Sequence, residues 1–405
     1  MRIIMTCQYY WPDNFLINEI AEDLVKKGHK VTVLTGLPDY TTTKIPNEYK
    51  FFRRRHEFHN GVEIVRVPII ARHHGFIMRV FNYLSYYVSS SIYARTHNFS
   101  NYDLIYAYQL APILMVNPGV IIKKRYKIPM FMYVLDLWPD QMKIWHVKEN
   151  NPLFKIMLKY SRKAYNCGDI VGITSEPFEK YLIDVCKVDS AKIIYLPQHS
   201  DKLKITSKQI RKEKDKKDLI FAGNIGKQQN LECLIKAISL MKHSERINVH
   251  IYGEGTDFLK CKEYTNKLKL NDIITFYGRV PKEKLANIYS KMDAFLLTLC
   301  SEKEIGYAAN TVPAKLQNYM SAGKPILASI DGGAYDIINK SGCGTAVHSG
   351  DCSAYANLLD DFVCNQIKYK DCGKKAIDYF NKHFEKEKVL KRHEDILNEL
   401  LKRKK

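Results

Sequence analysis

The chain lacks the long apolar run that a membrane-spanning helix requires, because none of its 405 residues fall in an uninterrupted apolar stretch of about 18 residues. The longest candidate, residues 76–93, is broken by polar side chains at Arg79, Asn82 and Ser85 and by the serines at 89–91. A spanning helix is therefore not expected. The first residues, MRIIMTCQYYWP, also lack the apolar region and cleavage site of a secretory signal, so we expect a first β-strand there.

Motifs that hold metals or redox cofactors are missing as well. The ten cysteines are scattered without a C-x-x-C pair, which disfavours a zinc site or a disulfide framework and favours reduced thiols. No convincing Asp-x-Asp pair offers a metal site, and no G-x-G-x-x-G fingerprint indicates a nicotinamide enzyme. We therefore expect that the protein needs neither a metal nor a cofactor.

Acidic residues are scarce, since 43 Asp and Glu face 63 Lys and Arg and the formal net charge is +20. Residues 51–100 contain seven Arg against only Glu57 and Glu63. Zinc-finger spacing, an RNP motif and a basic region with heptads are all missing, so we expect no nucleic-acid partner. The aromatic segment 75–93, flanked by basic residues, favours an anionic membrane surface as partner. This segment is predicted to be a core helix of its domain, an interfacial helix, or both.

Short apolar strands alternate with helices along the chain. Strands are expected at 3–6, 30–35, 61–67, 102–106, 130–135 and 170–174, then at 218–222, 248–252, 273–276, 294–299 and 326–329. Helices are expected at 15–27, after Gln229 and over about 385–401. The charged stretch 197–217 has no apolar period and is expected to hold a domain boundary. Repeated strand–helix units predict an α/β protein with two parallel, doubly wound domains that face a central cleft.

The most informative stretch is Asn310–Ser329, which is predicted to form a loop, a helix, a turn and a strand. Thr311 is placed to cap the helix, and Pro313 is tolerated in its first turn. The strand before it delivers the chain to the carboxyl edge of a parallel sheet, so the N–H groups at the start of the helix point into the crevice where such sheets bind ligands. With Lys315 in the first turn, this is predicted to be an anion site, and a diphosphate is the expected ligand.

This stretch resembles the signature region of family 4 of the retaining glycosyltransferases, which have the two-domain GT-B fold. Family members commonly carry Glu-x7-Glu here, whereas this chain has Asn310-x7-Asn318, followed by the matching small-residue turn SAGKPI at 321–326. The resemblance implies that the first position lies near the donor sugar and that the second contacts the ribose. Asparagine can form hydrogen bonds at both places but carries no charge.

The resemblance covers essentially the whole chain and implies two Rossmann-like domains. Residues 1–200 are expected to bind the acceptor and residues 201–384 the nucleotide sugar. The last helix, 385–405, is expected to cross back to the first domain.

The loop after the first strand, QYYWPDNFLIN at 8–18, is suited to binding a sugar. Trp11 offers an aromatic face, and Asp13, Asn14 and Asn18 offer carboxylate and amide groups. The alternative is that Trp11 and Phe15 only pack the loop.

Other acceptor contacts are predicted at the ends of later strands. Asp39 lies in a Gly-x-Pro-Asp turn, which is first a turn signal, and the resemblance implies acceptor contact there. The run DLWPD at 136–140 brings two acids and an indole to a strand end, where clustered carboxylates are costly unless they bind something. It is similar to a run typical of a bacterial surface-polysaccharide branch, so Asp136 is the predicted partner of the acceptor hydroxyl and Trp138 a further contact. Alternatively, Asp136 caps the next segment. Gln109 lies where many relatives have a sugar-site histidine.

The loop GNIGK at 223–227 joins a strand to a helix in the second domain and is a weak signal alone. Family members often bind the diphosphate here through an Arg and a Lys. Alignment on the following helix places Asn224 and Gln229 at those positions. Lys227, Lys303 and above all Lys315 remain to supply charge, unless they are merely solvated. The predicted donor contacts therefore include Gly223, Asn224, Lys227, Lys303, Thr311 and Asn318, together with Arg279 and Val280, which the resemblance places against the base.

The resemblance implies a retaining transferase that moves a hexose or N-acetylhexosamine, possibly N-acetylfucosamine, from a nucleoside diphosphate sugar that is expected to be UDP-linked. We expect it to act without a metal. The expected acceptor is a polyprenyl-diphosphate-linked saccharide at the cytoplasmic face of the membrane, in capsule or O-antigen assembly. Lys315, Asn310 and Asp136 are the predicted catalytic residues. Two alternatives remain, a nucleotide-sugar epimerase of the same architecture and a non-catalytic sugar-binding scaffold.

Overall fold

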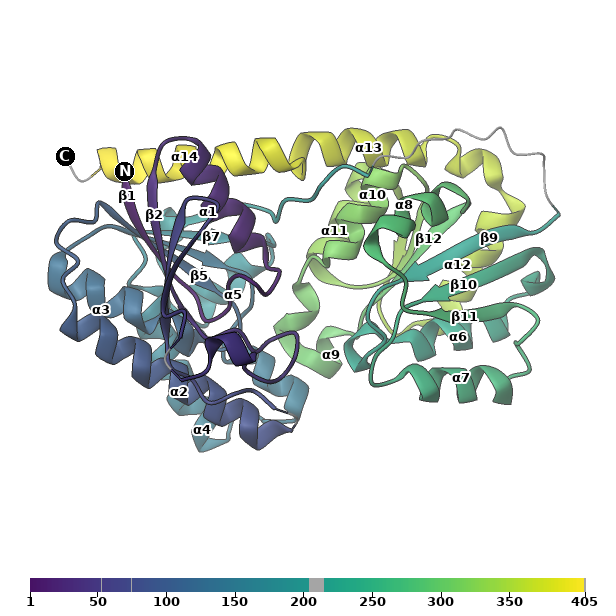
Figure 1. The fold of residues 1–405 in the computed structure, drawn as a ribbon. Coiled ribbons are helices and arrows are strands. Elements are labelled where there is room, and N and C mark those ends of the chain that lie inside the picture. Colours follow the sequence, from purple (N-terminus) through teal and green to yellow (C-terminus); the bar gives the residue numbers. More distant parts are fainter. Residues whose placement is uncertain (52, 74, 204–214, 404–405) are drawn as a thin grey trace. The chain divides into compact units, whose positions relative to one another are not determined.

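The computed structural model describes residues 1–51, 53–73, 75–203 and 215–403, which form two compact units (Figure 1). Unit 1 contains Met1–Gln198 and the chain from Val389 onward, and unit 2 contains His199–Lys388. The division falls in the charged stretch 197–217, of which residues 204–214 lie outside the described ranges.

Unit 1 is built on a sheet with the strand order β3-β4-β2-β1-β5-β6-β7-β8. The strands are β1 (Arg2–Thr6), β2 (Lys30–Gly36), β3 (His56–His59), β4 (Val62–Val67), β5 (Leu104–Gln109), β6 (Met130–Val134), β7 (Ile170–Ile173) and β8 (Ile193–Tyr195). Neighbouring strands are parallel except β3, which is antiparallel to β4. The chain runs from β1 outward to β4 and then returns to β5 beside β1, so the carboxyl ends of β1 and β5 form a topological switch point.

Helices cover this sheet because its strands are apolar on both faces. They are α1 (Leu16–Lys26), α2 (Phe76–Thr96), α3 (Asn117–Tyr126), α4 (Pro152–Tyr165), α5 (Phe178–Asp184) and the last helix, α14 (Lys386–Lys402). Val389, Ile396, Leu397 and Leu400 of α14 are buried in the same core as the strands of unit 1. The end of the chain therefore completes the core of the first domain.

Unit 2 has a fully parallel sheet with the order β11-β10-β9-β12-β13-β14. Its strands are β9 (Lys217–Ala222), β10 (Ile247–Tyr252), β11 (Ile274–Gly278), β12 (Ala294–Thr298), β13 (Ile326–Ser329) and β14 (Gly344–Val347). Its helices are α6 (Leu231–Leu240), α7 (Phe258–Lys267), α8 (Lys282–Ser290), α9 (Glu302–Ile305), α10 (Ala314–Ala322), α11 (Gly332–Ser341), α12 (Cys352–Cys364) and α13 (Cys372–His383).

Two hydrophobic cores lie on opposite faces of this sheet. Leu219 and Phe221 of β9 belong to one core, and Ile220 and Ala222 belong to the other. Successive side chains of a strand point to opposite faces, so a strand covered on both sides reads as a continuous apolar run.

The predicted α/β architecture with two Rossmann-like domains is confirmed. The sequence prediction omitted β3, β8 and β14, which are short strands at sheet edges. Their side chains are only partly buried, so they lack the apolar run that marks a central strand. Within the described ranges, no helix combines the length and hydropathy that a membrane crossing requires. The cleft between the domains stays a prediction.

Candidate active site

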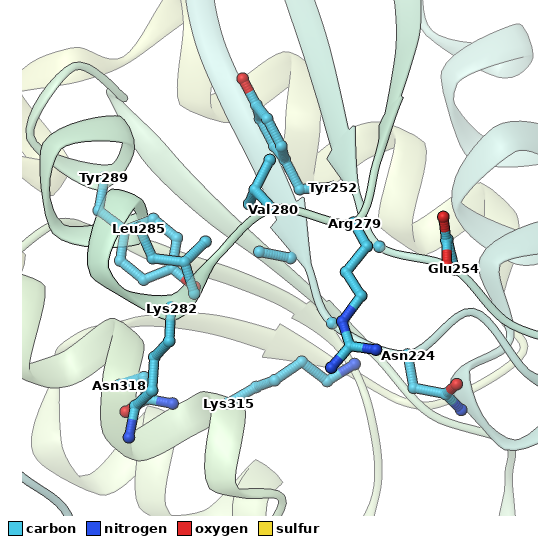
Figure 2. Close-up of a pocket in the computed structure, with 13 residues that line it drawn as sticks. Asn224, Tyr252, Glu254, Arg279, Val280, Lys282, Leu285, Tyr289, Lys315 and Asn318 are labelled. Carbon is cyan, nitrogen blue, oxygen red and sulfur yellow. The ribbon is translucent and has the colours of Figure 1, made fainter. Parts of the chain in front are cut away.

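A cavity of about 480 Å³ opens in unit 2 at the carboxyl ends of β9 and β10 (Figure 2). This volume is typical of a small-molecule site. The cavity lies next to the switch point of the sheet, between β9 and β12, to which the chain returns after β11. Its lining comes from three parts of the unit, namely the strand-end loops, α8 with the turn before it, and α10: Ala222, Gly223, Asn224, Tyr252, Gly253, Glu254, Arg279, Val280, Lys282, Leu285, Tyr289, Lys315 and Asn318.

Glycines let the two strand-end loops approach each other at the floor of the cavity. Gly223 and Gly253 have φ angles of 149° and 141°, which favour glycine over other residues. A Cβ atom on Gly253 would collide with the carbonyl of Gly223, and a Cβ on Gly223 would meet the side chain of Lys315 at 2.8 Å. The glycines therefore make room for the lysine.

Lys315 lies in the first turn of α10 and reaches into this cavity. Its ammonium donates a hydrogen bond to Oε1 of Gln229 and lies 4.1 Å from the centre of the Phe221 ring. Burial lowers the pKa of Lys315 to about 7. Water stabilises this buried charge only weakly. We therefore expect an anionic ligand to stabilise the protonated form of Lys315 strongly.

The start of α10 differs from the sequence prediction. The helix begins at Ala314, with Pro313 in extended conformation at the N-cap position, so Thr311 does not cap it. Thr311 instead follows a short 3-10 helix over Gly306–Asn310. The reason is that Val312 packs into the core and the chain remains extended until Pro313.

Basic and aromatic side chains line the rest of the cavity. In Figure 2, Arg279 and Lys315 extend toward the same part of the cavity, and Asn224 lies beside them. Tyr252 stacks on Tyr277, with ring centroids 4.5 Å apart and planes within 8°. Val280 lies near Tyr252 in the same view. The cavity thus has a cationic side and an aromatic, apolar side, a combination that suits a nucleotide.

The predicted donor residues divide into two groups. Gly223, Asn224, Arg279, Val280, Lys315 and Asn318 share the lining of the cavity. Lys227, Lys303, Thr311 and Asn310 are not part of that lining. Lys303 is exposed on α9.

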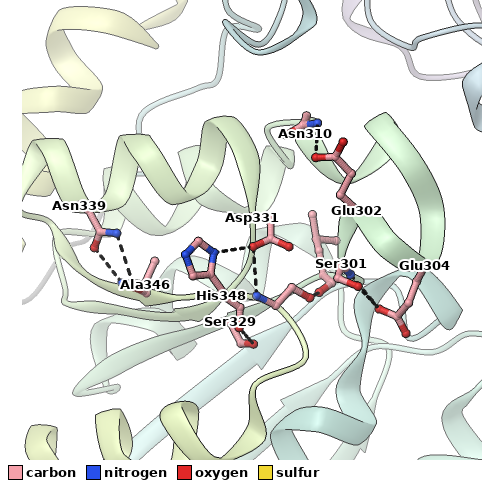
Figure 3. Close-up of polar contacts among 11 residues, drawn as sticks. Ser301, Glu302, Glu304, Asn310, Ser329, Asp331, Asn339, Ala346 and His348 are labelled. Atoms are coloured by element: carbon pink, nitrogen blue, oxygen red, sulfur yellow. Dashed lines mark hydrogen bonds and ion pairs between the residues drawn. The ribbon is translucent and has the colours of Figure 1, made fainter. Parts of the chain in front are cut away.

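Asn310 and Asn318, which replace the two family acids, have different surroundings. Asn318 lines the cavity, and its Oδ1 accepts a hydrogen bond of 3.0 Å from the hydroxyl of Ser200. Asn310 is buried, and its Nδ2 donates to Oε2 of Glu302 at 3.5 Å (Figure 3). A carboxylate from α9 therefore lies beside the position where the family has its first acid, and the sequence prediction did not include it.

A second polar cluster in Figure 3 joins the segment after β13 to the segment after β14. Asp331 accepts hydrogen bonds from His348 at 2.9 Å and from the backbone N–H of Ser349 at 3.3 Å. Gly332 packs so closely on Asn310 that any side chain would collide with it. Asn310 is thus fixed by the start of α11.

In unit 1, the first predicted acceptor loop is tied to its own neighbours. Asp13 is buried and accepts hydrogen bonds from the backbone N–H groups of Tyr40 and Thr41 and from the Thr41 hydroxyl, at 3.1, 3.0 and 2.6 Å. Asn18 is also buried and donates to the carbonyl of Asp13 at 2.9 Å. Both residues therefore have structural roles, and their predicted acceptor contact stays a prediction.

Two of the predicted acceptor residues of this loop remain accessible. Asn14 is exposed, and Trp11 is 36% exposed and stacks on His59, with ring centroids 3.7 Å apart. Their predicted role in binding a sugar is compatible with this exposure.

Asp39 belongs to a buried polar network in unit 1. It accepts hydrogen bonds from the backbone N–H of Arg72 and from Nδ2 of Asn82, both at 2.7 Å. Asn82 in turn accepts a bond of 2.8 Å from Gln8. Burial raises the pKa of Asp39 to about 6, and its hydrogen bonds only partly offset this effect.

Asp136 leaves the end of β6, as predicted from the sequence. It accepts hydrogen bonds from the backbone N–H of Ala111, at 3.1 Å, and from the side chain of Gln141. Burial raises its pKa to about 6. Trp138 and Gln109 are buried, and their predicted acceptor contacts stay predictions.

Three functional candidates were missed by the sequence prediction. Tyr252, Glu254 and Lys282 line the cavity, but they belong to no motif that assigned them a role. Tyr252 ends β10 and Glu254 follows Gly253, and Lys282 lies two residues after Val280 at the start of α8. Among the described residues, no cluster of three His, Cys, Asp or Glu side chains is arranged to hold a metal ion.

Comparison with known proteins gives matches along nearly the whole chain. Residues 16–199 match the family described as glycosyl transferase 4-like domain, and residues 204–379 match the family described as glycosyl transferases group 1. A stretch of 143 residues is 30% identical to the lipopolysaccharide 1,6-galactosyltransferase of Escherichia coli. That stretch is 35% of this chain and only 37% of the relative.

Two solved structures are similar over 98% of this chain. One is sucrose-phosphate synthase from Thermosynechococcus elongatus, with 16% identity, 98% of that chain covered and a TM-score of 0.75. The other is HepE of Anabaena in complex with UDP, with 15% identity, 100% of that chain covered and a TM-score of 0.72. At such identity the likeness establishes the fold. The first half of the chain therefore belongs to the glycosyl transferase 4-like domain family, and the second half belongs to the glycosyl transferases of group 1.

Proposed function

We propose that the protein transfers a sugar from a nucleoside diphosphate sugar to a lipid-linked saccharide during synthesis of a bacterial surface polysaccharide. The observation that carries this proposal is the cavity of unit 2, where Lys315 and Arg279 line the space together with Tyr252 and Val280. A diphosphate suits the cationic side, and a nucleobase suits the aromatic, apolar side. Family membership supports the class of reaction.

In the proposed reaction, the bond between the anomeric carbon and the diphosphate oxygen breaks, and a bond to the acceptor oxygen forms on the same face of the sugar. The nucleoside diphosphate leaves with the bonding electrons, and its growing negative charge is stabilised by the ammonium of Lys315 and the N–H groups at the start of α10. The proton of the acceptor hydroxyl passes to the departing phosphate oxygen or to solvent. A metal ion is not part of this proposal.

The identity of the substrates is a further part of the proposal. We infer a UDP-linked hexose or N-acetylhexosamine as donor, since HepE is a fold relative solved with UDP. A polyprenyl-diphosphate-linked saccharide, in capsule or O-antigen assembly, is the proposed acceptor. The similarity to a lipopolysaccharide galactosyltransferase supports an acceptor that carries a lipid. Such a reaction takes place on the cytoplasmic face of the membrane, where the protein binds peripherally.

The test is nucleotide release from a panel of UDP-, GDP- and dTDP-sugars, with and without a short-chain polyprenyl-diphosphate-linked saccharide that is soluble in water. Release that requires one donor together with the acceptor is the expected result and identifies the donor. Conversion of one donor to another sugar without release would instead indicate an epimerase. Binding without either reaction would indicate a scaffold.

A further inference from the structure

The helix α2 of unit 1 has an unusual distribution of side chains. Every exposed residue between its first residue, Phe76, and Ile92 is apolar. These residues are 37–68% exposed and recur at helical spacing, so they form one continuous surface, here called the α2 stripe: Phe76, Ile77, Val80, Phe81, Leu84, Val88 and Ile92. A helix that faces water normally has the opposite pattern.

The inward face of α2 is correspondingly polar. Asn82 is buried and bonds to Asp39, to Gln8 and, at 2.7 Å, to the carbonyl of Ile70. The buried hydroxyl of Tyr86 donates to the carbonyl of Cys7 at 2.9 Å. Rotating the helix to bury the stripe would break these bonds and leave buried polar groups unsatisfied, at about 1–3 kcal/mol each. The polar network thus fixes the apolar stripe on the outside.

The helix α4 extends the same surface. Tyr160 of α4 packs edge-on against Tyr87 of α2, with ring centroids 6.2 Å apart. Leu153 and Ile156 of α4 are 51% and 65% exposed. Phe76 of the stripe also contacts Trp145, which precedes α4, at 5.7 Å between rings. The apolar surface therefore extends over two neighbouring helices.

The charges on these helices have one sign. The sequences of α2, α3 and α4 contain no Asp or Glu. They contain many basic residues, which are Arg79 and Arg95 in α2, Lys123, Lys124 and Arg125 in α3, and Lys155, Lys159, Arg162 and Lys163 in α4. Lys123 pairs with Asp169, so the basic residues of α2 and α4 carry the charge argument. An occupant of this surface should be apolar where it meets the stripe and anionic beside those residues.

A bilayer with anionic lipids meets both requirements over the whole length of the stripe. With 21 residues, α2 is roughly 30 Å long. An interfacial helix inserts its apolar face about 5–10 Å into the headgroup and acyl boundary, while flanking Lys and Arg attract anionic headgroups. We propose that α2 and α4 dock unit 1 flat on an anionic membrane through the α2 stripe. This inference rests on the proposed function in one respect: a lipid-linked acceptor would lie in the membrane to which unit 1 binds.

The experiment measures binding of the full chain to vesicles of phosphatidylcholine with or without phosphatidylglycerol, by flotation. The wild type is expected to bind the anionic vesicles and to bind pure phosphatidylcholine much more weakly. The double variant Ile77→Gln/Ile92→Gln is expected to weaken binding to anionic vesicles roughly 10- to 100-fold, since two apolar side chains no longer leave water. Glutamine favours the helix more than isoleucine does, so the fold is kept.

Matched variants test whether the loss of binding is specific to the docking surface or follows from any exposed apolar or basic residue. The control for the stripe is Leu259→Gln/Ile367→Gln in unit 2, where both side chains are at least as exposed, at 70% and 90%. The basic rim is tested by Lys155→Gln/Lys159→Gln in α4, against Lys262→Gln/Lys267→Gln in α7, which are also exposed. Each Lys at an anionic surface contributes about fivefold in affinity, so the α4 pair should lose roughly 10- to 30-fold at low salt. Both controls should bind as the wild type does.

Equal losses in the unit 2 controls, or no vesicle binding by the wild type, would overturn the proposal. So would a stripe variant that turns a dimer into a monomer in sedimentation while vesicle binding stays unchanged, because the occupant would then be a second copy of the chain. The outcome is independent of the catalytic proposal, because nucleotide release with the water-soluble acceptor needs no membrane. Release without vesicle binding would refute the docking surface alone, and docking without release would refute the transferase alone.

Discussion

The two units of the molecule are built on the same kind of sheet, but the polar residues at their strand ends have different roles. In unit 2, Lys315, Arg279 and Asn318 line one cavity. In unit 1, Asp13 and Asp39 are buried and hold neighbouring backbone segments together through hydrogen bonds. Polar residues at the carboxyl edge of a sheet can therefore either line a cavity or hold neighbouring loops together.

Loop composition explains much of this difference. The loops of unit 2 contain Gly223 and Gly253, which let two backbones approach closely and leave an open space above them. The first loops of unit 1 contain bulky side chains, and Tyr9, Phe15 and Tyr40 pack against one another there. Aromatic packing fills the space that glycine leaves open. Substitutions in the two units should consequently affect different properties.

The largest effect is expected for Lys315→Ala in unit 2. Turnover should fall roughly 10²- to 10³-fold, because the charge that stabilises the departing diphosphate is lost. The matched control is Lys340→Ala on α11, which removes an exposed lysine outside the cavity lining and should change turnover little. Both are measured as nucleotide release, with thermal unfolding as a check on the fold. Equal turnover in both variants would remove Lys315 from the proposed mechanism.

In unit 1, Asp13→Ala is expected to act mainly on stability. It removes the acceptor of three part-buried hydrogen bonds from Tyr40 and Thr41, at a cost of about 2–4 kcal/mol in the free energy of unfolding. Asn14→Ala, at an exposed neighbour, should stay within about 0.5 kcal/mol. Denaturant titration gives both values. Unchanged stability with a raised KM for the acceptor would show that Asp13 binds substrate instead.

A smaller effect is expected when the affinity of unit 2 for a nucleotide is measured as a function of pH. The pKa of Lys315 is about 7 in the empty site, and an anion binds best to its protonated form. The affinity for UDP-glucose, whose doubly esterified diphosphate is fully ionised in this range, should therefore fall as pH rises above 7, by up to about tenfold per pH unit. Calorimetry in buffers of different ionisation enthalpy should reveal proton uptake on binding. Lys315→Arg keeps its charge and should flatten the profile, whereas a flat profile in the wild type would contradict the assignment.

The sequence was informative about the cavity of unit 2 for a physical reason. Apolar runs and the glycines and prolines after them mark where strands end, and in a parallel sheet these ends share one edge. Gly223, Arg279 and Lys315 were predicted on this basis and on the resemblance, and they line one cavity. The path of a loop was not predictable in the same way. Lys303 and Thr311 are close to Lys315 in sequence, yet the 3-10 turn and extended segment before α10 keep them out of the cavity lining.

The sequence by itself determined the α/β class and the two doubly wound sheets, because these depend on local apolar patterns. The return of the last helix to the first domain was expected only from the family resemblance, since an apolar stripe does not specify which core a helix joins. Only the tertiary structure decided which side chains face a ligand, which bond to each other and which face outward. Gln229 supports Lys315 across 86 positions, and Asn82 fixes the orientation of α2 through Asp39, 43 positions away. Such contacts join residues that no local pattern connects, so they exist only once the sheets have formed.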